Sequence, residues 1–537
     1  MKVYQSNMYD CTTTVYSGDS IFGSGFGELI NDYEQPPRLC DMLGFTRSLY
    51  EHLNKGKTIN YRNVQHSDWF FTGNKEFVKI GSAPYGSEKV VKLSDGATAE
   101  ISFTNAKKMI IFYQKGRSGT SYATGQLTMQ ISTNDGTSYS SMSDIVKGRT
   151  TKKGFGDVKV YDAAVDTINT SFTDELGYAV MGNDTANNRY SCYGKEVYNG
   201  LSESETYKVK ITSQGENYIW GIAYTTEDVI HLVYNCSKPG FNWEQLCQSF
   251  WADIIETEAD NVILEAPMYH DRTENNVIDG TEALFSLYEK YKINCILCSC
   301  PPGGVIVTGS TAIILGDDNA SSYYPGEQFY TFYNQNRFLY FKTQLSDKNV
   351  SPDRFEKYRC TIDNIEYEVE VVQSVADKNI NYVSVVVPKN FPKEIADVTF
   401  TKIVSSSDTT LSSFTCSAVD ERISMEEHRD IILKQSRKYG YLFVDLLESF
   451  RDIAKQVGED LDTEYWDMDE NHPLYDYVLS LAQNASQYPD LNKWYLQGKP
   501  FPMNFMSNFF SISDGHHLQY NAQVAIWDFL KTKVFLE

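Results

Sequence analysis

The sequence predicts an α/β fold interrupted by two β-rich insertions. Apolar strand patterns alternate with amphipathic helix patterns near the start, in the middle and at the end of the chain. Two longer stretches between these parts contain short strand patterns separated by Gly, Asn, Asp and Ser turns. The length of 537 residues is compatible with two to four domains of about 150 residues each.

Composition narrows the classes of protein to which this chain can belong. Lys and Arg total 48 against 71 Asp and Glu, a net charge of −23, which argues against a general affinity for nucleic acid or membrane. Apolar residues make up 41% of the chain, too many for a disordered protein. The longest apolar runs, such as Met109 to Tyr113, are too short to span a bilayer, and the polar N-terminus predicts no signal peptide. We expect a soluble, acidic, multidomain protein.

The first α/β part and the first insertion follow one another closely. A strand pattern from Asp10 to Tyr16 precedes a glycine-rich loop and a helical pattern from Arg47 to Leu53. The spacing of the short strands that follow predicts an antiparallel sandwich. Its clearest strands are Val90 to Leu93, Ala99 to Phe103, Met109 to Tyr113, Leu127 to Ile131 and Tyr207 to Ile211.

In the middle of the chain, strands and helices alternate with short links, which indicates a parallel sheet covered on both faces. The expected elements are strands at Val229 to Asn235, Asn261 to Leu264 and Ile293 to Cys300, and helices at Trp243 to Glu256 and Thr281 to Lys292.

A second β-rich stretch and a final α/β part complete the chain. The stretch includes strand patterns at Glu366 to Val372, Tyr382 to Val387 and Val398 to Ile403. The final part contains a helix from Ser424 to Tyr439, a strand from Tyr441 to Asp445 and a closing helix from Ala522 to Lys531.

These patterns predict one α/β domain divided into three parts, 1–58, 226–305 and 420–537. The insertions are 59–225, a jelly-roll-like sandwich, and 306–419, a second β-rich unit. Division of this kind leaves each unit long enough to bury its own hydrophobic core.

One cysteine cluster and two acidic clusters are candidate metal ligands. Cys295, Cys298 and Cys300 lie in an apolar strand pattern, and no second Cys or His cluster completes a zinc site. The acidic clusters at 317–319 and 467–470 lack the regular spacing and the glycine of a calcium loop. The sequence predicts core cysteines and no metal site.

Two short motifs at opposite ends of the chain carry the candidate chemistry. Gly18-Asp19-Ser20 ends a strand pattern, which places a serine hydroxyl group at the carboxyl edge of a parallel sheet, where α/β folds bind ligands. Asp514 lies three residues before His517, a spacing that lets a carboxylate orient an imidazole that takes a proton from serine. Alone, the first motif is equally an ordinary loop, and the second a polar helix cap.

Together the two motifs resemble the SGNH (GDSL-like) hydrolase family. The resemblance covers the three α/β parts, about half of the chain, and implies the family's flavodoxin-like parallel sheet. It implies that Ser20 is the nucleophile, His517 the general base and Asp514 its orienting partner. The chemistry of the family requires neither a metal nor a cofactor.

Two further sequence blocks are compared with the same family. Gly240, which follows a strand pattern, resembles the glycine whose N–H group joins that of Ser20 in the oxyanion hole, and it is equally a turn glycine. The third block departs from the family's Gly-x-Asn-Asp, because His270 occupies the asparagine position and no glycine precedes it. Either His270 replaces that donor, or Asn275 or Asn276 does, or the site is impaired.

The resemblance implies a serine esterase that removes O-acyl groups, O-acetyl above all, from a polysaccharide. The alternative is a catalytically impaired SGNH-fold protein with a structural or receptor-binding role in a virion. A large, acidic, β-rich protein without a signal peptide resembles phage tail or baseplate components, so a virion is the expected location, with other virion proteins or further copies of the chain as partners. A cytoplasmic protein, or one exported by another route, is the remaining alternative. Aromatic residues of the first insertion, Trp69, Phe70, Phe71 and Tyr85, are interpreted either as sandwich core or as a surface that stacks on sugars.

Overall fold

The computed structural model describes the greater part of the chain. The described residues are 11–19, 22, 44–79, 89–117, 125–152, 159–173, 191–237, 241–267, 273–301, 304–308, 328–332, 336–343, 357–362, 365–373, 381–388, 396–404, 407–416, 423, 425–456, 467–468, 475–484, 486, 501–502 and 526–531.

A parallel sheet of five strands organises the α/β part. Its order is β17-β1-β18-β19-β28, and all of its strand pairs are parallel. Numbered along the chain this order is 2-1-3-4-5, the doubly wound order of flavodoxin-like sheets. The five strands are β1 (Cys11–Ser17), β17 (Ile230–Asn235), β18 (Asn261–Glu265), β19 (Asn294–Cys298) and β28 (Leu442–Val444). The predicted α/β core with a parallel sheet is therefore confirmed.

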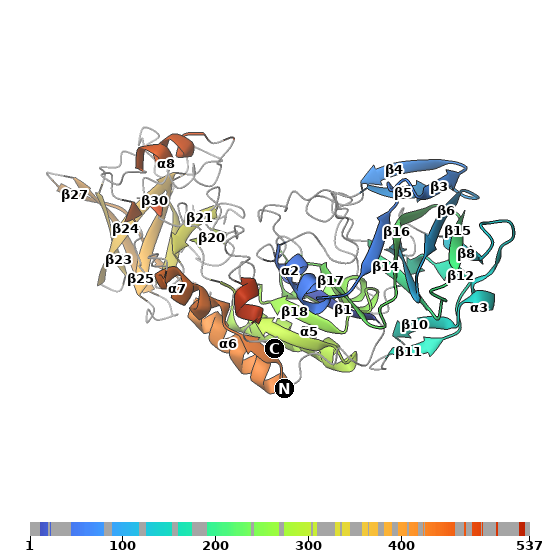
Figure 1. Cartoon of the computed structure of the whole chain (residues 1–537). Helices are drawn as coiled ribbons and strands as arrows, with labels where there is room; N and C mark the ends of the chain where they lie inside the picture. Colours follow the sequence, from blue (N-terminus) through green and yellow to red (C-terminus); the bar gives the residue numbers. More distant parts are fainter. Residues whose placement is uncertain are drawn as a thin grey trace.

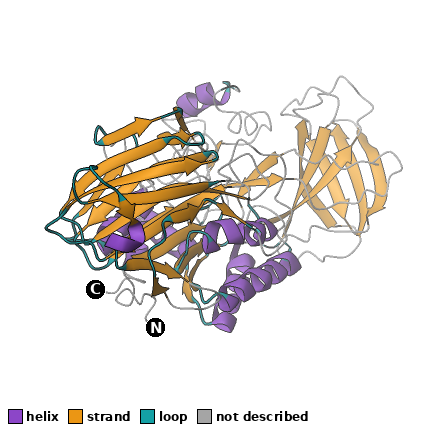
Figure 2. Cartoon of the chain, turned by 90° about the vertical axis from the view of Figure 1, so that its right-hand side faces the viewer, coloured by secondary structure: helices purple, strands orange, loops and turns teal. Residues whose placement is uncertain are grey.

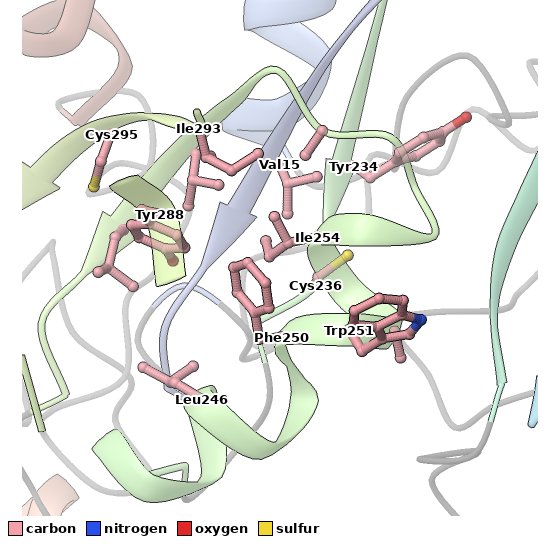
Figure 3. Packing of buried hydrophobic residues seen from close by; sticks show 14 of the residues in the cluster. Val15, Tyr234, Cys236, Leu246, Phe250, Trp251, Ile254, Tyr288, Ile293 and Cys295 are labelled. Atoms are coloured by element: carbon pink, nitrogen blue, oxygen red, sulfur yellow. The ribbon is translucent and has the colours of Figure 1, made fainter. Parts of the chain in front are cut away.

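Three adjacent strands of this sheet are buried along their whole length. Every residue of β1, β17 and β18 is buried, as expected for a parallel sheet covered on both faces. On one face, Phe250 of α4 packs against Tyr288 of α5 with ring centroids 5.8 Å apart (Figure 3). Cys295 and Cys298 of β19 and the adjacent Cys300 are buried thiols outside any disulfide, which confirms the predicted core cysteines.

The described helices are α2 (Gly44–Leu53), α3 (Met142–Ile145), α4 (Trp243–Phe250), α5 (Glu274–Lys290), α6 (Met425–Tyr439), α7 (Leu446–Gln456) and α8 (Tyr475–Ala482). A π-helical segment, Trp251–Ile255, continues α4, where the sequence predicts one regular helix. In Figure 1, α5 and α6 lie side by side along the parallel sheet. No helix among the described residues is long and apolar enough to cross a membrane.

Helix α5 begins seven residues before the predicted start at Thr281, so that prediction was wrong. Thr273 caps the helix by accepting a hydrogen bond from the Asn276 N–H group at 3.2 Å. Glycine disfavours helix interiors, yet Gly280 lies within α5. In the structure, a Cβ atom at Gly280 would lie 2.2 Å from Cβ of Trp243. The glycine therefore permits the close packing of α4 against α5.

The first β-rich region enters and leaves the α/β part at a single point. Its first strand, β2 (Ile59–Asn63), pairs antiparallel with its last, β16 (Asn217–Thr225), so that Ile59 lies opposite Thr225. The Thr225 hydroxyl group also donates a hydrogen bond of 2.6 Å to the Thr58 carbonyl oxygen. Adjacent ends allow a folded unit to be inserted without spreading the sheet that receives it.

Two sheets of this region pack face to face as a sandwich (Figure 2). The nine-stranded sheet contains β2, β16, β4 (Lys75–Lys79), β5 (Lys89–Leu93), β7 (Lys108–Arg117), β10 (Gly148–Lys152), β11 (Lys159–Asp162), β13 (Ser171–Phe172) and β14 (Ser191–Asn199). The six-stranded sheet contains β3 (Trp69–Thr72), β6 (Thr98–Thr104), β8 (Gln126–Ser132), β9 (Ser140–Ser141), β12 (Thr167–Asn169) and β15 (Thr206–Gln214). The predicted sandwich is confirmed, and its jelly-roll class stays a prediction.

The nine-stranded sheet is buried on both faces where β16 runs. Ile219 and Ile222 of β16 belong to the core between the two sheets, whereas Trp220 and Ala223 belong to the core shared with the parallel-sheet strands. All nine residues of β16 are consequently buried. On the exposed side of the sandwich, β15 keeps an alternating pattern of buried and accessible residues.

Ion pairs border the junction between the sandwich and the α/β part. Lys115 of β7 lies 2.6 Å from the Glu256 carboxylate, which follows the π-helical segment. The largely buried Lys195 of β14 donates a hydrogen bond of 2.5 Å to the Thr257 carbonyl oxygen and lies 3.3 Å from the Glu258 carboxylate. These contacts give the junction a polar rim around an apolar centre.

The second β-rich region also consists of antiparallel sheets. A six-stranded sheet has the order β22-β25-β24-β23-β26-β27, next to a separate pair, β20-β21, and a short pair, β29-β30, follows in the final part. Their bounds are β20 (Gly304–Thr308), β21 (Gln328–Phe332), β22 (Asn336–Thr343), β23 (Lys357–Ile362), β24 (Ile365–Gln373), β25 (Asn381–Pro388), β26 (Ala396–Val404), β27 (Ser407–Cys416), β29 (Asp467–Met468) and β30 (Phe501–Pro502).

We predict that Trp220→Ala lowers the free energy of unfolding by about 3–5 kcal/mol, because it removes the largest fully buried side chain from the shared core. It also leaves the Gln114 side chain without the indole N–H group that donates to it at 3.1 Å. Denaturant unfolding measures the loss. Phe70→Ala, on the exposed side of the same sandwich, serves as the control and should change stability by less than about 0.5 kcal/mol. Equal effects of the two substitutions would contradict the shared core.

Candidate functional site

The carboxyl edge of the parallel sheet has a topological switch point between β1 and β18. The chain passes from β1 to β17 on one side, and the later strands then add on the other side, beginning with β18. Doubly wound sheets bind ligands in the crevice at such a point. Gly18 and Asp19 follow β1, and Glu265 ends β18, so these three residues lie at the edge where a site is expected.

The turn after β1 is shaped by contact with β18. Gly18 has φ of +150°, a region that favours glycine. A Cβ atom at this position would lie 2.7 Å from Oε2 of Glu265. The Asp19 N–H group donates a hydrogen bond of 3.2 Å to the same Oε2 atom. Glycine is therefore required both by the backbone conformation and by the carboxyl group that packs against it.

Asp19 and Glu265 form a buried pair of carboxyl groups. Asp19 is 1% exposed and Glu265 is fully buried. Burial raises the pKa of Glu265 well above its ordinary value, and the nearby Asp19 charge raises this pKa further. Both effects favour the neutral, protonated form of Glu265.

A second set of contacts anchors the chain just beyond Asp19. The Phe22 ring is fully buried and packs edge-on against Tyr16 of β1, with centroids 5.7 Å apart. The Asn235 side chain at the end of β17 donates a hydrogen bond of 2.7 Å to the Phe22 carbonyl oxygen. Its own carbonyl oxygen accepts a hydrogen bond of 2.9 Å from the Ser237 N–H group. Residues on both sides of Ser20 in the sequence, Asp19 and Phe22, are thus held by neighbouring strands.

A separate polar cluster lies at the other end of this edge. Ser299, which follows β19, donates a hydrogen bond of 3.3 Å to Asp445, which follows β28, and accepts one of 3.1 Å from the Leu447 N–H group. Asp445 in turn caps α7 by accepting a hydrogen bond of 3.1 Å from the Glu448 N–H group. These bonds join β19, β28 and α7, and they account for the Ser299 and Asp445 side chains structurally.

The five predicted site residues, Ser20, Gly240, His270, Asp514 and His517, lie outside the described residues, so their roles stay predictions. Asn275 and Asn276, the alternative donors, lie exposed in the first turn of α5.

Helical residues 526–531, which follow the predicted Asp514–His517 motif, are placed beside the N-terminal part of the chain. Trp527 packs edge-on against His52 of α2, with ring centroids 5.6 Å apart. Ile526 and Leu530 are fully buried. Helix α2 itself contacts β17. Asn54, directly after α2, donates a hydrogen bond of 2.9 Å to the His231 carbonyl oxygen of β17. The end of the chain thus packs against the part that carries Gly18-Asp19-Ser20.

The aromatic residues of the first insertion divide between core and surface. Trp69 is buried in the sandwich core and stacks on Phe71 at 5.9 Å, so the core interpretation holds for Trp69. Phe70 is 62% exposed. Tyr85 lies outside the described residues.

Sequence analysis missed Glu265 and Asn235, which hold the turn after β1. The available signal was a charged or amide residue at the last position of an otherwise apolar strand pattern. That signal is weak, because many strands end in a polar residue. The contacts with Asp19 and Phe22 depend on the parallel pairing of β1 with β17 and β18.

No protein-family model matches this chain, and no curated protein matches it. Among solved structures the chain is similar to a peptidoglycan O-acetylesterase, with 13% identity and a TM-score of 0.26 over 56% of this chain and 70% of that chain. It is also similar to a carbohydrate-binding module from Clostridium stercorarium in complex with cellobiose, with 6% identity and a TM-score of 0.17 over 31% of this chain and 94% of the module. A xylan-binding module has 12% identity and a TM-score of 0.15 over 32% of this chain and 97% of the module. At these TM-scores the likenesses assign neither a family nor a function, so function is inferred from the residues of the chain itself.

We predict that Gly18→Ala destabilises the protein by about 1–3 kcal/mol through backbone strain and by a similar further amount through the contact with Glu265. The matched control is Gly56→Ala, which also has positive φ (+79°) but no atom within 4 Å of the added Cβ. The control should cost about 1–2 kcal/mol. Urea unfolding of both variants measures the difference. An equal loss of stability at the two positions would show that the Glu265 side chain moves aside at no cost in free energy.

Proposed function

We propose that this chain is a serine esterase of the SGNH type, with Ser20 as nucleophile, His517 as general base and Asp514 as the orienting carboxylate. One observation carries the proposal: Gly18-Asp19, directly before Ser20, forms an anchored turn at the switch-point edge of a doubly wound parallel sheet. A nucleophile has to be held rigidly at such an edge if it is to meet both a base and an ester. The packing of residues 526–531 beside α2 further supports the pairing of the two sequence motifs.

The proposed reaction proceeds through two acyl transfers. His517 takes the proton of the Ser20 hydroxyl group while the oxygen attacks the ester carbonyl carbon. The N–H groups of Ser20 and Gly240, with His270 as a further donor, stabilise the oxyanion. Return of the proton from His517 releases the alcohol and leaves an acyl-serine. Water, activated by His517, then releases the carboxylic acid and restores Ser20.

The proposed substrate is an O-acylated, above all O-acetylated, polysaccharide. This choice rests on the sequence resemblance and on the β-rich regions that accompany the α/β part. The alternative, an impaired SGNH-fold protein that binds a receptor, is favoured by the departure from Gly-x-Asn-Asp at His270. Covalent labelling of Ser20 separates the two, because a fluorophosphonate reacts only with an activated serine.

We predict that Ser20→Ala lowers kcat/KM for a nitrophenyl acetate by at least about 10⁴-fold, because the nucleophile is lost, and that His517→Ala has nearly the same effect. Both variants should lose labelling by a fluorophosphonate. Ser24→Ala, in the same glycine-rich stretch, is the matched control and should retain activity and labelling. Wild-type hydrolysis that survives Ser20→Ala would show that the nucleophile is a different residue.

We predict that His270→Ala lowers kcat by about 10²-fold with little change in stability, if the imidazole is one oxyanion donor among several. His270→Asn, which restores the amide of the family pattern, should recover most of the loss. Steady-state kinetics on acetylated polysaccharide and on nitrophenyl acetate measure both effects. Unchanged kcat in His270→Ala would remove His270 from the oxyanion hole without affecting the role of Ser20.

A further inference from the structure

A pair of carboxyl groups lies buried directly before the proposed nucleophile, and the proposed reaction does not use it. Asp19 and Glu265 are 1% and 0% exposed, and they come from the turn after β1 and from the last position of β18. Neither belongs to the set of Ser20, Asp514 and His517. Burial of two acids in contact costs free energy, because an ionised carboxylate loses its hydration and like charges repel. Because burial of this pair costs free energy, we expect the pair to serve a function.

Glu265 makes two contacts that define the turn. Its Oε2 atom accepts the hydrogen bond of 3.2 Å from the Asp19 N–H group. The same atom occupies the space that a side chain at residue 18 would fill, 2.7 Å from the expected Cβ position. Gly18 and the peptide group between Gly18 and Asp19 are therefore held by one side chain, directly before Ser20 in the sequence.

We propose that Glu265 is a positioning residue of this esterase: its carboxyl group, bonded to the Asp19 N–H group and packed against Gly18, orients the main chain that presents the Ser20 N–H group to the oxyanion. The inference rests on the proposed function. It adds a residue that the motifs do not contain and that touches neither substrate nor reacting atoms.

The protonation of the pair follows from its surroundings. Among the described residues, the titratable groups that face Glu265 are Asp19 from the turn after β1, and Cys298 and Cys300 from the β19 side. Burial, and then the Asp19 charge, raise the pKa of Glu265. In its neutral form Glu265 has a proton to donate toward the Asp19 carboxylate, while its Oε2 atom accepts from the Asp19 N–H group. Ionisation of Glu265 would set two negative charges against each other beneath the turn, so the turn would lose its geometry.

The test compares Glu265→Gln, Glu265→Ala and Ser299→Ala. Glutamine retains the acceptor for the Asp19 N–H group and a donor toward its carboxylate, so Glu265→Gln should keep kcat within about threefold of the wild type at neutral pH. Glu265→Ala should lower kcat by about 10²-fold with little change in KM, because small misplacements of reacting groups have effects of this size. Ser299→Ala removes an equally buried side chain at the same edge, and should reduce stability without lowering kcat.

The pH dependence separates positioning from a merely structural role. The wild type should lose kcat as the pH rises through the pKa of Glu265, whereas Glu265→Gln should lack this alkaline loss. Stability supplies a readout besides activity. Above the unfolded-state pKa of about 4.3, unfolding of the wild type releases the Glu265 proton, so its stability falls with rising pH relative to Glu265→Gln. Urea midpoints of the two proteins should therefore diverge in favour of Glu265→Gln as the pH is raised.

Each outcome decides between the proposals. If Ser20→Ala is inactive while Glu265→Ala keeps full kcat, the positioning role is overturned and the esterase stands. If Glu265→Gln loses as much kcat as Glu265→Ala, or retains the alkaline loss of the wild type, the shared-proton arrangement is overturned. If the wild type neither hydrolyses esters nor reacts with a fluorophosphonate, the esterase proposal falls and the positioning role falls with it.

Discussion

The position of β1 between β17 and β18 in the parallel sheet is the constraint on which the rest of the molecule depends. This strand pairs on one side with β17 and on the other with β18, which begin at residues 230 and 261. The chain between β1 and β17 must therefore bring its two ends close together for these strands to pair. Closing so long a connection costs chain entropy. The sandwich meets this requirement because its first and last strands, β2 and β16, are neighbours.

The sandwich is more than a closed loop, because one of its sheets also covers the α/β part. Trp220 and Ala223 of β16 pack in the same core as β1 and β17, while Ile219 and Ile222 pack within the sandwich. The two units therefore share buried apolar area and do not behave as independent domains joined by a linker. Lys115 and Lys195 close the rim of this junction with buried or half-buried ion pairs.

The same pairing of β1 with β18 creates the chemical environment of the candidate site. It brings Asp19 and Glu265 together at the carboxyl edge, and it leaves a conformation at residue 18 that only glycine accepts without strain. Asn235 at the end of β17 anchors Phe22 from the other side. Gly18 and Asp19, which look like part of a loose loop in the sequence, thus belong to a turn held by the end of β18, and Phe22 is anchored by the end of β17.

Local patterns were sufficient for the α/β core, the sandwich and the buried cysteines, because strand and helix periodicities follow from which side chains face apolar surroundings. Local patterns were insufficient where the environment of a residue depends on a contact with a residue distant in the sequence. Gly280 lies inside α5, where its lack of a side chain makes room for Trp243, and β16 shows no alternation because both of its faces are buried. Likewise, the motifs alone nominated Ser20, Asp514 and His517, whereas the role of Glu265 arose only when β18 was placed beside β1. The spacing of residues along a chain reflects local conformation only. The pairing of strands hundreds of residues apart depends on the burial of the whole sheet, and no single segment of the sequence carries that information.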